Sequence, residues 1–501
     1  MLLVFPPLAK ACEPPAGISR LAGFLLAHDQ PCYLLDANIE AQLHLLAEET
    51  TADDTWSRRA AKNRSRNLES LRNPATYQNS SRYQRCVSDI NRLLELTGKT
   101  RGLQLSLSNF QDQTLSPLSS EDLLRSSAQP EQSIFFPWFG QRLPDLIEEK
   151  KIKRIGFSLN YLSQALTCFS MIGFVKSRYP HIEIIVGGGL VTSWMRKPGW
   201  QNPFSHLIDY LVAGPGEQQL LNILTGDKDR QQHATPTFDG LPNSDYLAPG
   251  FILPYAASSG CYWNRCSFCP EKAEGNPYLA AAIDTVMADL DQLIEKHHPA
   301  LVHFLDNAVS PALMQAMIKR EKPVPWYGFA RVSRFLTDRS FCRQLKQSGC
   351  KMLKLGIESG DQEVLTAMAK GINLESVSAT LHCLHDAGIA TYVYLLFGTP
   401  QESHAAARNT LAFTARHAKL ITFLNLAIFN MPLGGEDDLQ LDSREFYRGD
   451  LSLYRDFIHP LSWHRKDIRV FLDREFKRHP AISPILKRDP LLFTSNHAAF
   501  F

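Results

Sequence analysis

The chain has 501 residues, which is too long for one ordinary hydrophobic core and predicts two or three domains. With 44% hydrophobic residues, 21% charged residues and a formal net charge of +2, the composition is that of a globular protein and argues against general binding to nucleic acid. No run of eighteen apolar residues occurs, and the start, MLLVFPPLAKACEPP, lacks a cleavable leader, so we expect a cytoplasmic protein without a membrane span.

An alternation of strands and helices opens the chain. MLLVFPP and CYLLDAN predict short strands, and GISRLAGFLLAHD between them has apolar residues at helical spacing. From about residue 50 to 130 the sequence turns polar, which predicts a helical insertion or a partly mobile segment. The alternation resumes in IKRIGFSLNY, IEIIVGGG and YLVAGPG. We therefore expect a parallel sheet covered on both faces over residues 1–225.

A second series of strands and helices follows a Pro-rich, aperiodic stretch at 226–250, which predicts a linker. LVHFLDN, VPWYGFARV, KMLKLGIESG, IATYVYLLFGTP and ITFLNLAIFNMP are five strand candidates separated by helical stretches. Their number predicts a second α/β domain with a barrel-like order over 251–434. Residues 435–501 are charged and aromatic, and predict a C-terminal extension with helices.

The stretch CYWNRCSFCP contains Cys261, Cys266 and Cys269, with four and then two residues between them. The chain has only ten cysteines, too few for a disulfide scaffold, so a tight cluster favours a metal site. A structural zinc site needs four closed ligands, and no second CxxC occurs, although a remote ligand such as His303 is an alternative. A four-iron four-sulfur cluster held by three thiolates leaves one iron open to an external ligand.

With this loop the chain resembles the radical S-adenosylmethionine (SAM) enzymes that carry a cobalamin-type N-terminal domain. The first gap between cysteines is one residue longer than in the usual motif of these enzymes. The resemblance implies an α/β protein with a Rossmann-like (cobalamin-binding-type) parallel sheet domain, a partial (β/α)6 radical SAM barrel and a helical C-terminal extension. It also implies a 4Fe–4S cluster on the three cysteines and SAM on the open iron.

The predicted strand ends of the barrel supply candidates for SAM contacts, because the sites of parallel barrels lie at the carboxyl edge of the strands. LGIESGDQEVLTAMAKG is the most specific of these stretches in its similarity to the family, and LLFGTPQES resembles the turn that brings backbone close to the adenine. The candidates are Asp306, Asn307, Arg331, Glu358, Ser359, Gly398, Thr399 and Pro400. Helix caps and plain turns are the alternative roles for most of them.

In the first domain, LVFPP, LLDAN, GFSLNYLSQA, IVGGG and VAGPGE together resemble the cobalamin-binding domains that precede radical SAM barrels. IVGGGLVTS does not match GxGxxG followed by an acidic residue on the next strand, which argues against a nicotinamide site. The DxHxxG motif is absent, so either cobalamin binds without a protein-derived lower ligand or the domain keeps only the fold. Candidate cobalamin contacts are Ser158, Asn160, Gln164, Gly187 and Gly188, with strand-end and turn positions as their alternative role.

The resemblance implies reductive cleavage of SAM to a 5′-deoxyadenosyl radical, with an electron donor such as flavodoxin or ferredoxin and a small-molecule or peptide substrate. Because the cofactor carries the difficult step, no catalytic side chain is assigned. With cobalamin the expected reaction is methylation, and without it rearrangement, cyclisation or thiolation.

A non-catalytic zinc or iron–sulfur binding module is an alternative of a different class. Nucleic acid is not its expected partner, because neutralising phosphates requires clustered Lys and Arg. The only candidate patch is SRRAAKNRSRN at 57–67, and this stretch also fits a solvated helix face.

Overall fold

The computed structural model describes residues 1–49, 54–226, 233–491 and 497–501. The chain divides into two compact units. The first contains Met1–Ile252, Tyr447–Leu453 and Leu491–His497, and the second contains Leu253–Phe446, Tyr454–Pro490 and Ala498–Phe501. Among the described residues, no helix combines the length and the apolar character needed to cross a membrane.

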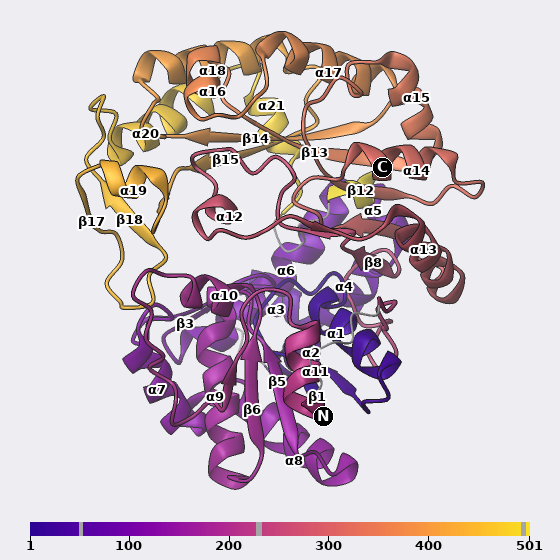
Figure 1. Cartoon of the computed structure of the whole chain (residues 1–501), viewed down its shortest axis with the longest axis vertical. Helices are drawn as coiled ribbons and strands as arrows, with labels where there is room; N and C mark the ends of the chain where they lie inside the picture. The colour runs from indigo at the N-terminus through magenta and orange to yellow at the C-terminus, as the bar shows by residue number, and fades with distance from the viewer. Residues whose placement is uncertain (50–53, 227–232, 492–496) are drawn as a thin grey trace. The chain divides into compact units, whose positions relative to one another are not determined.

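The first unit is built on a five-stranded parallel sheet with the order β2-β1-β5-β6-β7 (Figure 1). Its strands are β1 (Leu2–Phe5), β2 (Tyr33–Asp36), β5 (Arg154–Ser158), β6 (Glu183–Gly187) and β7 (Tyr210–Leu211). The middle strands are short apolar runs whose side chains are mostly buried, as expected for parallel strands covered by helices on both faces. The strand positions predicted from the sequence are confirmed.

Helices connect these strands in the order that a doubly wound sheet requires. They are α1 (Ala16–Ala27), α2 (Ala37–Ala47), α8 (Phe136–Lys150), α9 (Leu162–Arg178), α10 (Gly189–Met195) and α11 (Glu217–Thr225). Asp36, at the end of β2, caps α2 by accepting hydrogen bonds from the backbone N–H groups of Asn38 and Ile39. The carboxyl ends of the strands therefore lead directly into the helix starts at one edge of the sheet.

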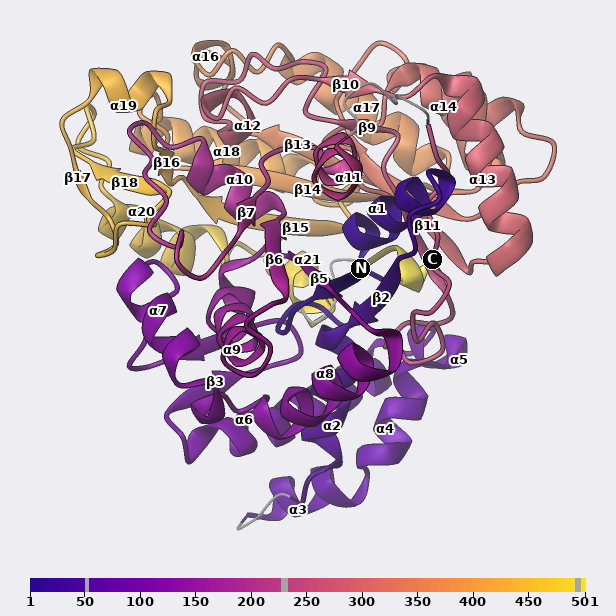
Figure 2. The same cartoon turned by 60° about the horizontal axis from the view of Figure 1, so that its bottom comes forward.

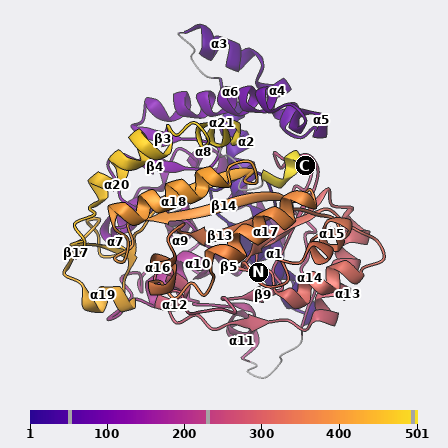
Figure 3. The ribbon, with the colours of Figure 1, turned by 90° about the horizontal axis from the view of Figure 1, so that it is seen from above.

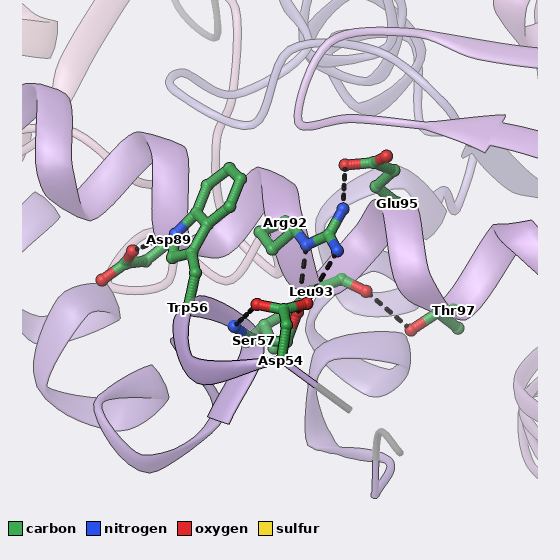
Figure 4. A network of polar contacts seen from close by, with 8 residues as sticks. All are labelled: Asp54, Trp56, Ser57, Asp89, Arg92, Leu93, Glu95 and Thr97. Atoms are coloured by element: carbon green, nitrogen blue, oxygen red, sulfur yellow. Dashed lines mark hydrogen bonds and ion pairs between the residues drawn. The ribbon is translucent and has the colours of Figure 1, made fainter. Parts of the chain in front are cut away.

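The polar stretch between α2 and α8 is mostly helical where it is described (Figure 2). It forms α3 (Thr55–Lys62), α4 (Arg64–Leu71), α5 (Pro74–Tyr77), α6 (Ser80–Lys99), the hairpin β3 (Leu103–Leu105) and β4 (Phe110–Asp112), and α7 (Ser120–Ala128). Figure 4 shows how polar side chains join α3 to α6. The guanidinium of Arg92 bonds to Asp54 and Ser57, each at 3.0 Å, and to Glu95 at 3.1 Å. Some polar side chains of this stretch therefore form contacts between helices.

The aperiodic stretch at 233–250 is part of the first unit, and residues 227–232 lie outside the described residues. Thr237 donates its backbone N–H to Ser19 at 3.0 Å, and Leu247 donates to Ala11 at 2.8 Å. The Tyr246 hydroxyl donates to the carboxylate of Asp36 at 2.8 Å. The segment predicted as a linker therefore packs along the first unit through backbone hydrogen bonds, which need no periodic sequence pattern.

The second unit contains a six-stranded sheet in the order β8-β11-β12-β13-β14-β15, of which Figure 3 labels β13 and β14. The strands are β8 (Ile252–Tyr255), β11 (Leu301–Phe304), β12 (Trp326–Ala330), β13 (Cys350–Glu358), β14 (Ala390–Phe397) and β15 (Phe423–Ile428). The intervening helices are α13 (Ile283–His297), α14 (Pro311–Lys319), α15 (Arg339–Gln347), α16 (Gln362–Ala367), α17 (Leu374–Asp386) and α18 (His404–Arg416). The predicted partial (β/α)6 architecture is confirmed.

The last part of the second unit adds an antiparallel sheet with the order β16-β18-β17. Its strands are β16 (Met431–Pro432), β17 (Ser443–Glu445) and β18 (Tyr454–Phe457), and its helices are α19 (Glu436–Gln440), α20 (Arg465–Phe471) and α21 (Ser483–Arg488). The helices agree with the predicted extension, whereas the sheet was not predicted. Its strands have only two to four residues, and β17 and β18 carry charges, so no alternation marks them.

Candidate functional site

The three cysteines lie on one loop of the second unit, between β9 (Ser258–Ser259) and α12 (Pro270–Ala273). Cys266 is buried, whereas Cys261 and Cys269 are half-buried. The backbone N–H of Ser267 donates to the carbonyl of Met368 at 3.1 Å, which ties this cluster loop to the end of α16. Cys261 and Cys269 each lie close enough to Cys266 to interact with it electrostatically. That the three thiolates ligate one cluster stays a prediction.

Trp263 anchors the lengthened first gap of the cluster loop. Its indole N–H donates to the carbonyl of Ala369 at 3.0 Å, and the guanidinium of Arg331 lies 4.2 Å from its ring centre. A Cβ at Gly371 would come within 2.0 Å of the indole, so only glycine leaves room for this contact. Trp263 therefore fixes this part of the cluster loop against the segment that follows α16.

Two basic side chains, Lys370 and Arg331, lie near Cys266. The ammonium group of Lys370 lies 2.7 Å from the carboxylate of Glu358, and Arg331 donates to the Lys370 carbonyl at 2.7 Å. Burial raises the pKa of the Cys266 thiol, while the nearby charges of Lys370 and Arg331 lower it. These two cations suit a loop that must hold thiolates.

An iron–sulfur cluster and a zinc ion require different arrangements of their ligands. A zinc ion holds all its ligands within about 2.0–2.3 Å of one point, whereas each thiolate of a cubane cluster binds its own iron. Within the described ranges, no three His, Cys, Asp or Glu side chains gather so closely that one ion could join them. His303, the alternative fourth zinc ligand, stacks on Tyr327 with ring centres 4.3 Å apart.

Two buried hydroxyls, one on the cluster loop and one after β14, also point to a bound group. Ser267 lies between Cys266 and Cys269, and Thr399 follows β14. Neither hydroxyl oxygen has a hydrogen-bond partner among the described residues. Buried hydroxyls normally have partners, so a ligand that supplies them is expected here.

Asp306 and Asn307 follow β11, as predicted, but their environments differ. Asp306 is buried and accepts hydrogen bonds from the backbone N–H of Ala257, at 3.1 Å, and from the Ser258 hydroxyl. Burial raises the pKa of Asp306, and the hydrogen bond from Ser258 opposes this shift. Asp306 therefore fixes the strand end that leads into the cluster loop, whereas Asn307 is exposed.

Glu358 and Ser359 end β13 and point to different partners. Glu358 has a left-handed backbone (φ 68°) and pairs with Lys370, beside the cluster loop. Ser359 is fully buried, and its hydroxyl lies 3.1 Å from the Thr410 hydroxyl on α18. The structure thus brings Glu358, but not the Ser359 hydroxyl, toward the group around Cys266.

The turn after β14 contains Gly398, Thr399 and Pro400 and leads to Glu402. The Gly398 N–H donates to the Glu402 carboxylate at 2.5 Å, and the indole N–H of Trp463 donates to the same oxygen at 3.0 Å. Burial raises the pKa of Glu402 to about 7, against the opposing effect of these hydrogen bonds. Sequence reasoning missed Trp463, and the only signal for it is the run of aromatic and basic residues in HPLSWHRK.

In the first unit, the five cobalamin candidates gather at the carboxyl edge of β5 and β6. The Asn160 side chain accepts from the Gly189 N–H at 2.9 Å and donates to the Ser158 hydroxyl at 3.0 Å. Gln164 is fully buried and donates to the Pro6 carbonyl at 2.7 Å. Asn160 and Gln164 thus stabilise this edge through internal hydrogen bonds. Tyr161, which was not predicted, is 56% exposed there.

A narrow slot of about 50 Å³ begins at this edge and includes Ser158, Gly187 and Gly188. Apart from Ser158, its walls are apolar side chains and five glycines. A Cβ at Gly214 would meet nothing within 4 Å, and one at Gly216 would lie 3.5 Å from Leu21. The slot therefore lets an apolar ligand group approach the backbone.

Residues 255–414 match the model of the Radical SAM superfamily. This part of the chain is a radical SAM domain. A radical SAM domain implies a 4Fe–4S cluster and SAM, and the loop with Cys261, Cys266 and Cys269 lies inside the matched range. The expectation drawn from the cysteine loop is confirmed at the level of the family.

Two curated relatives are methyltransferases by name. An uncharacterized methyltransferase of Pyrococcus horikoshii is 25% identical over 191 residues, covering 36% of this chain and 40% of the relative. The bacteriochlorophyllide d C-12(1)-methyltransferase of Chlorobaculum tepidum is 27% identical over 169 residues, covering 32% of this chain and 37% of the relative. The matches thus span less than half the length of these two relatives.

The fold is similar to that of TsrM, a radical SAM methyltransferase from Kitasatospora setae. Its structure with tryptophan and a SAM analogue superposes with a TM-score of 0.60 and 16% identity, covering 99% of this chain and 92% of TsrM. A second TsrM structure, with cobalamin and a [4Fe–4S] cluster bound, has a TM-score of 0.52 and 15% identity, covering 88% of this chain and 77% of TsrM. At this identity the likeness shows the fold alone.

Proposed function

We propose that this protein is a radical SAM enzyme that methylates an unactivated carbon of its substrate with the help of cobalamin. The observation that carries the proposal is the three-cysteine loop inside the radical SAM domain, with Lys370 and Arg331 beside Cys266. When bound, the cluster and SAM supply a 5′-deoxyadenosyl radical, which removes hydrogen from C–H bonds that no side-chain acid or base can activate at neutral pH.

The side chains of the second unit hold and orient these groups. Cys261, Cys266 and Cys269 would ligate the cluster. Arg331 would offset part of the negative charge of the thiolates, whereas Lys370 is already paired with Glu358. Asp306 positions the strand end before the cluster loop. The candidates for SAM contacts are Asn307, Arg331, Glu358, the backbone at Gly398 and Pro400, and the orphaned Thr399 hydroxyl.

Cobalamin is assigned to the carboxyl edge of the first unit. The slot with Ser158, Gly187 and Gly188 supports a flat apolar group close to the backbone, such as the benzimidazole base of cobalamin. The exposed ring of Tyr161 at the same edge offers an apolar surface to a large planar ligand. Without DxHxxG no side chain is proposed as a lower cobalt ligand.

The electron donor is proposed to be a small acidic carrier such as flavodoxin or ferredoxin. A groove of about 520 Å³ beside the cluster loop is lined by Trp263, Arg265 and Arg334 and by no acidic side chain. Electrostatic complementarity of this kind raises association rates of redox partners. We propose a cytoplasmic location for the protein and its carrier, because a reducing environment keeps the cysteine thiols free to ligate the cluster.

The function is tested with anaerobically reconstituted full-length protein. Wild type is expected to hold about four iron atoms and four sulfides per chain and to release 5′-deoxyadenosine from SAM when reduced. Cys266→Ser is expected to lose both properties, whereas Cys32→Ser, a matched change in the first unit, keeps them. A colourless wild type, or one zinc per chain, contradicts the enzyme and favours a binding module.

Methyl transfer is tested by products of its own. With methylcobalamin, reductant and SAM, the proposal expects S-adenosylhomocysteine together with a methylated product. Formation of 5′-deoxyadenosine without either product, across candidate substrates, favours the alternative of rearrangement, cyclisation or thiolation.

A further inference from the structure

A second pocket of the second unit lies at the carboxyl ends of β14 and β15. It encloses about 340 Å³, within the range of roughly 300–1,000 Å³ seen for small-molecule sites. Gly398, Ile428 and Phe429 lie at the strand ends, and the other walls come from the C-terminal extension. This extension pocket therefore combines the edge where parallel barrels bind ligands with residues that follow the barrel.

The charge of the extension pocket is strongly positive. Four side chains with fixed positive charge line it, against one carboxylate, that of Asp456; these four are Arg444, Arg455, Arg465 and Lys466. Asp456 is already paired with Arg444 at 2.6 Å. The pocket walls contain no further carboxylate for the other three cations. An anion is therefore the complementary ligand.

Arg465 is held in place before any ligand arrives. It donates to the Phe429 carbonyl at 3.1 Å and to the Asn430 side chain at 2.9 Å, both through Nη1. Its guanidinium also lies 4.7 Å from the ring centre of Phe446. A guanidinium fixed in this way presents a planar fork suited to carboxylate or phosphate oxygens.

The next residue supplies a different kind of positive charge. Within the described part of the chain, the ammonium group of exposed Lys466 makes no hydrogen bond or ion pair. Arg455, across the pocket on β18, lies 3.6 Å from Asp438 and donates to the Ser443 hydroxyl at 3.2 Å. Lys466 is therefore the cation most available to a bound anion.

Of the two histidines that line the pocket, His459 and His464, His459 is not part of this charge. The Nε2 of His459 donates to the Thr399 carbonyl at 2.9 Å, and its Nδ1 accepts from the Leu461 N–H at 3.2 Å. A ring that donates from one nitrogen and accepts at the other is neutral. Burial also lowers the pKa of His459, which agrees with this assignment.

Aromatic rings form the rest of the wall. Phe429, Phe446, Phe457 and Trp463 all line the pocket, and the rings of Phe429 and Phe457 are 5.9 Å apart. Such walls favour an apolar or aromatic body next to the charged group. The pocket thus has the two parts that recognise an amphiphilic acid.

We propose that the extension pocket binds the substrate, and that the substrate is a small molecule with a carboxylate or phosphate attached to an apolar body. Lys466, Arg455 and Arg465 would hold the acid group, and the phenylalanine rings would hold the body. The identification of the bound molecule as the substrate rests on the proposed radical SAM function. Binding itself can be measured separately.

Binding is tested by calorimetry on the full chain with phenyl phosphate, benzoate and uncharged benzyl alcohol. Wild type is expected to bind one or both acids at least about tenfold more tightly than benzyl alcohol, with weaker binding at high salt. Lys466→Gln and Arg455→Gln are each expected to weaken acid binding about tenfold. Arg469→Gln, an exposed change on the same helix outside the pocket, keeps it.

Three results would overturn the proposal. They are equal binding of benzyl alcohol and the acids, an equal loss in Arg469→Gln, and displacement of the acids by SAM, which would assign the pocket to the cosubstrate. Release of 5′-deoxyadenosine from SAM is measured on the same preparations. Acid binding without SAM cleavage supports the pocket and counts against the proposed function, whereas SAM cleavage without acid binding does the reverse.

Discussion

The carboxylate of Glu358 and the ammonium group of Lys370 lie 2.7 Å apart, and both side chains are almost buried. Glu358 stands in a left-handed backbone conformation (φ 68°) at the end of β13, and Lys370 follows α16. A non-glycine residue keeps this conformation only where its surroundings enforce it. The ion pair therefore joins two segments that flank the cluster loop.

Removing one partner of this pair is expected to lower the free energy of unfolding more than removing both. Lys370→Met leaves a buried carboxylate without its cation and should lower the free energy of unfolding by about 3–5 kcal/mol. The double variant Glu358→Gln/Lys370→Met should recover part of the loss. Urea unfolding of the metal-free protein measures both. Lys477→Met, which removes an exposed ion pair with Asp473, should change little. Additive losses would contradict the coupling.

The buried carboxyl of Glu402 predicts a dependence of stability on pH. Its pKa is raised to about 7 in the folded state, so between about pH 4.5 and 7 the folded protein holds a proton that the unfolded chain has lost. Stability should therefore fall as the pH rises through this window and level off above it.

Glu402→Gln keeps an oxygen for Gly398 and Trp463 but cannot ionise. This variant should reduce the loss of unfolding free energy over this pH window by an amount on the order of 3 kcal/mol. Urea unfolding at pH 5, 6, 7 and 8 measures this, with Glu363→Gln on the exposed side of α16 as control. Parallel curves for wild type and Glu402→Gln would show that Glu402 does not titrate in this range.

The slot in the first unit predicts a graded steric effect. A side chain at Gly216 would point toward Leu21 and Val212, which both line the slot. Gly216→Ala should weaken binding of hydroxocobalamin slightly, and Gly216→Leu should abolish it, because the larger chain fills the slot. Gel filtration followed by absorbance measures bound cobalamin. Full binding by Gly216→Leu would place cobalamin elsewhere.

The groove beside the cluster loop predicts selective loss of reduction by a protein donor. Arg265→Glu and Arg334→Glu should slow cluster reduction by flavodoxin, most clearly at low salt, because they reverse the charge that attracts an acidic carrier. Reduction by dithionite should not change. Arg343→Glu, exposed on α15, alters the net charge equally and serves as control. Equal slowing in all three variants would point to net charge rather than to this groove.

The sequence predicted the parts of the fold that local patterns encode. Apolar runs of four to eight residues marked most strands, and the spacing of Cys261, Cys266 and Cys269 marked the cluster loop. The contacts that shape the site join residues far apart in the chain. Trp463 lies 61 residues after Glu402, and no periodicity connects them. Such pairs depend on tertiary packing, which a local pattern does not contain.

Ser359 illustrates the same limit. Its place in the GxESG turn predicted a contact to SAM, but the hydroxyl lies against Thr410 on α18 and also accepts from the Asp361 N–H. The stretch was placed correctly at the strand end, yet the direction of one side chain depends on the packing of the following helix. The conformation of Glu358, which turns the chain there, is equally invisible in the sequence.

Electron paramagnetic resonance of the reduced, reconstituted protein tests the central claim most directly. If three thiolates leave one iron open, adding SAM must change the spectrum of the reduced cluster, because the cosubstrate becomes a ligand of that iron. We expect this change in wild type and in Cys32→Ser. A reduced cluster whose spectrum is the same with and without SAM would contradict the account.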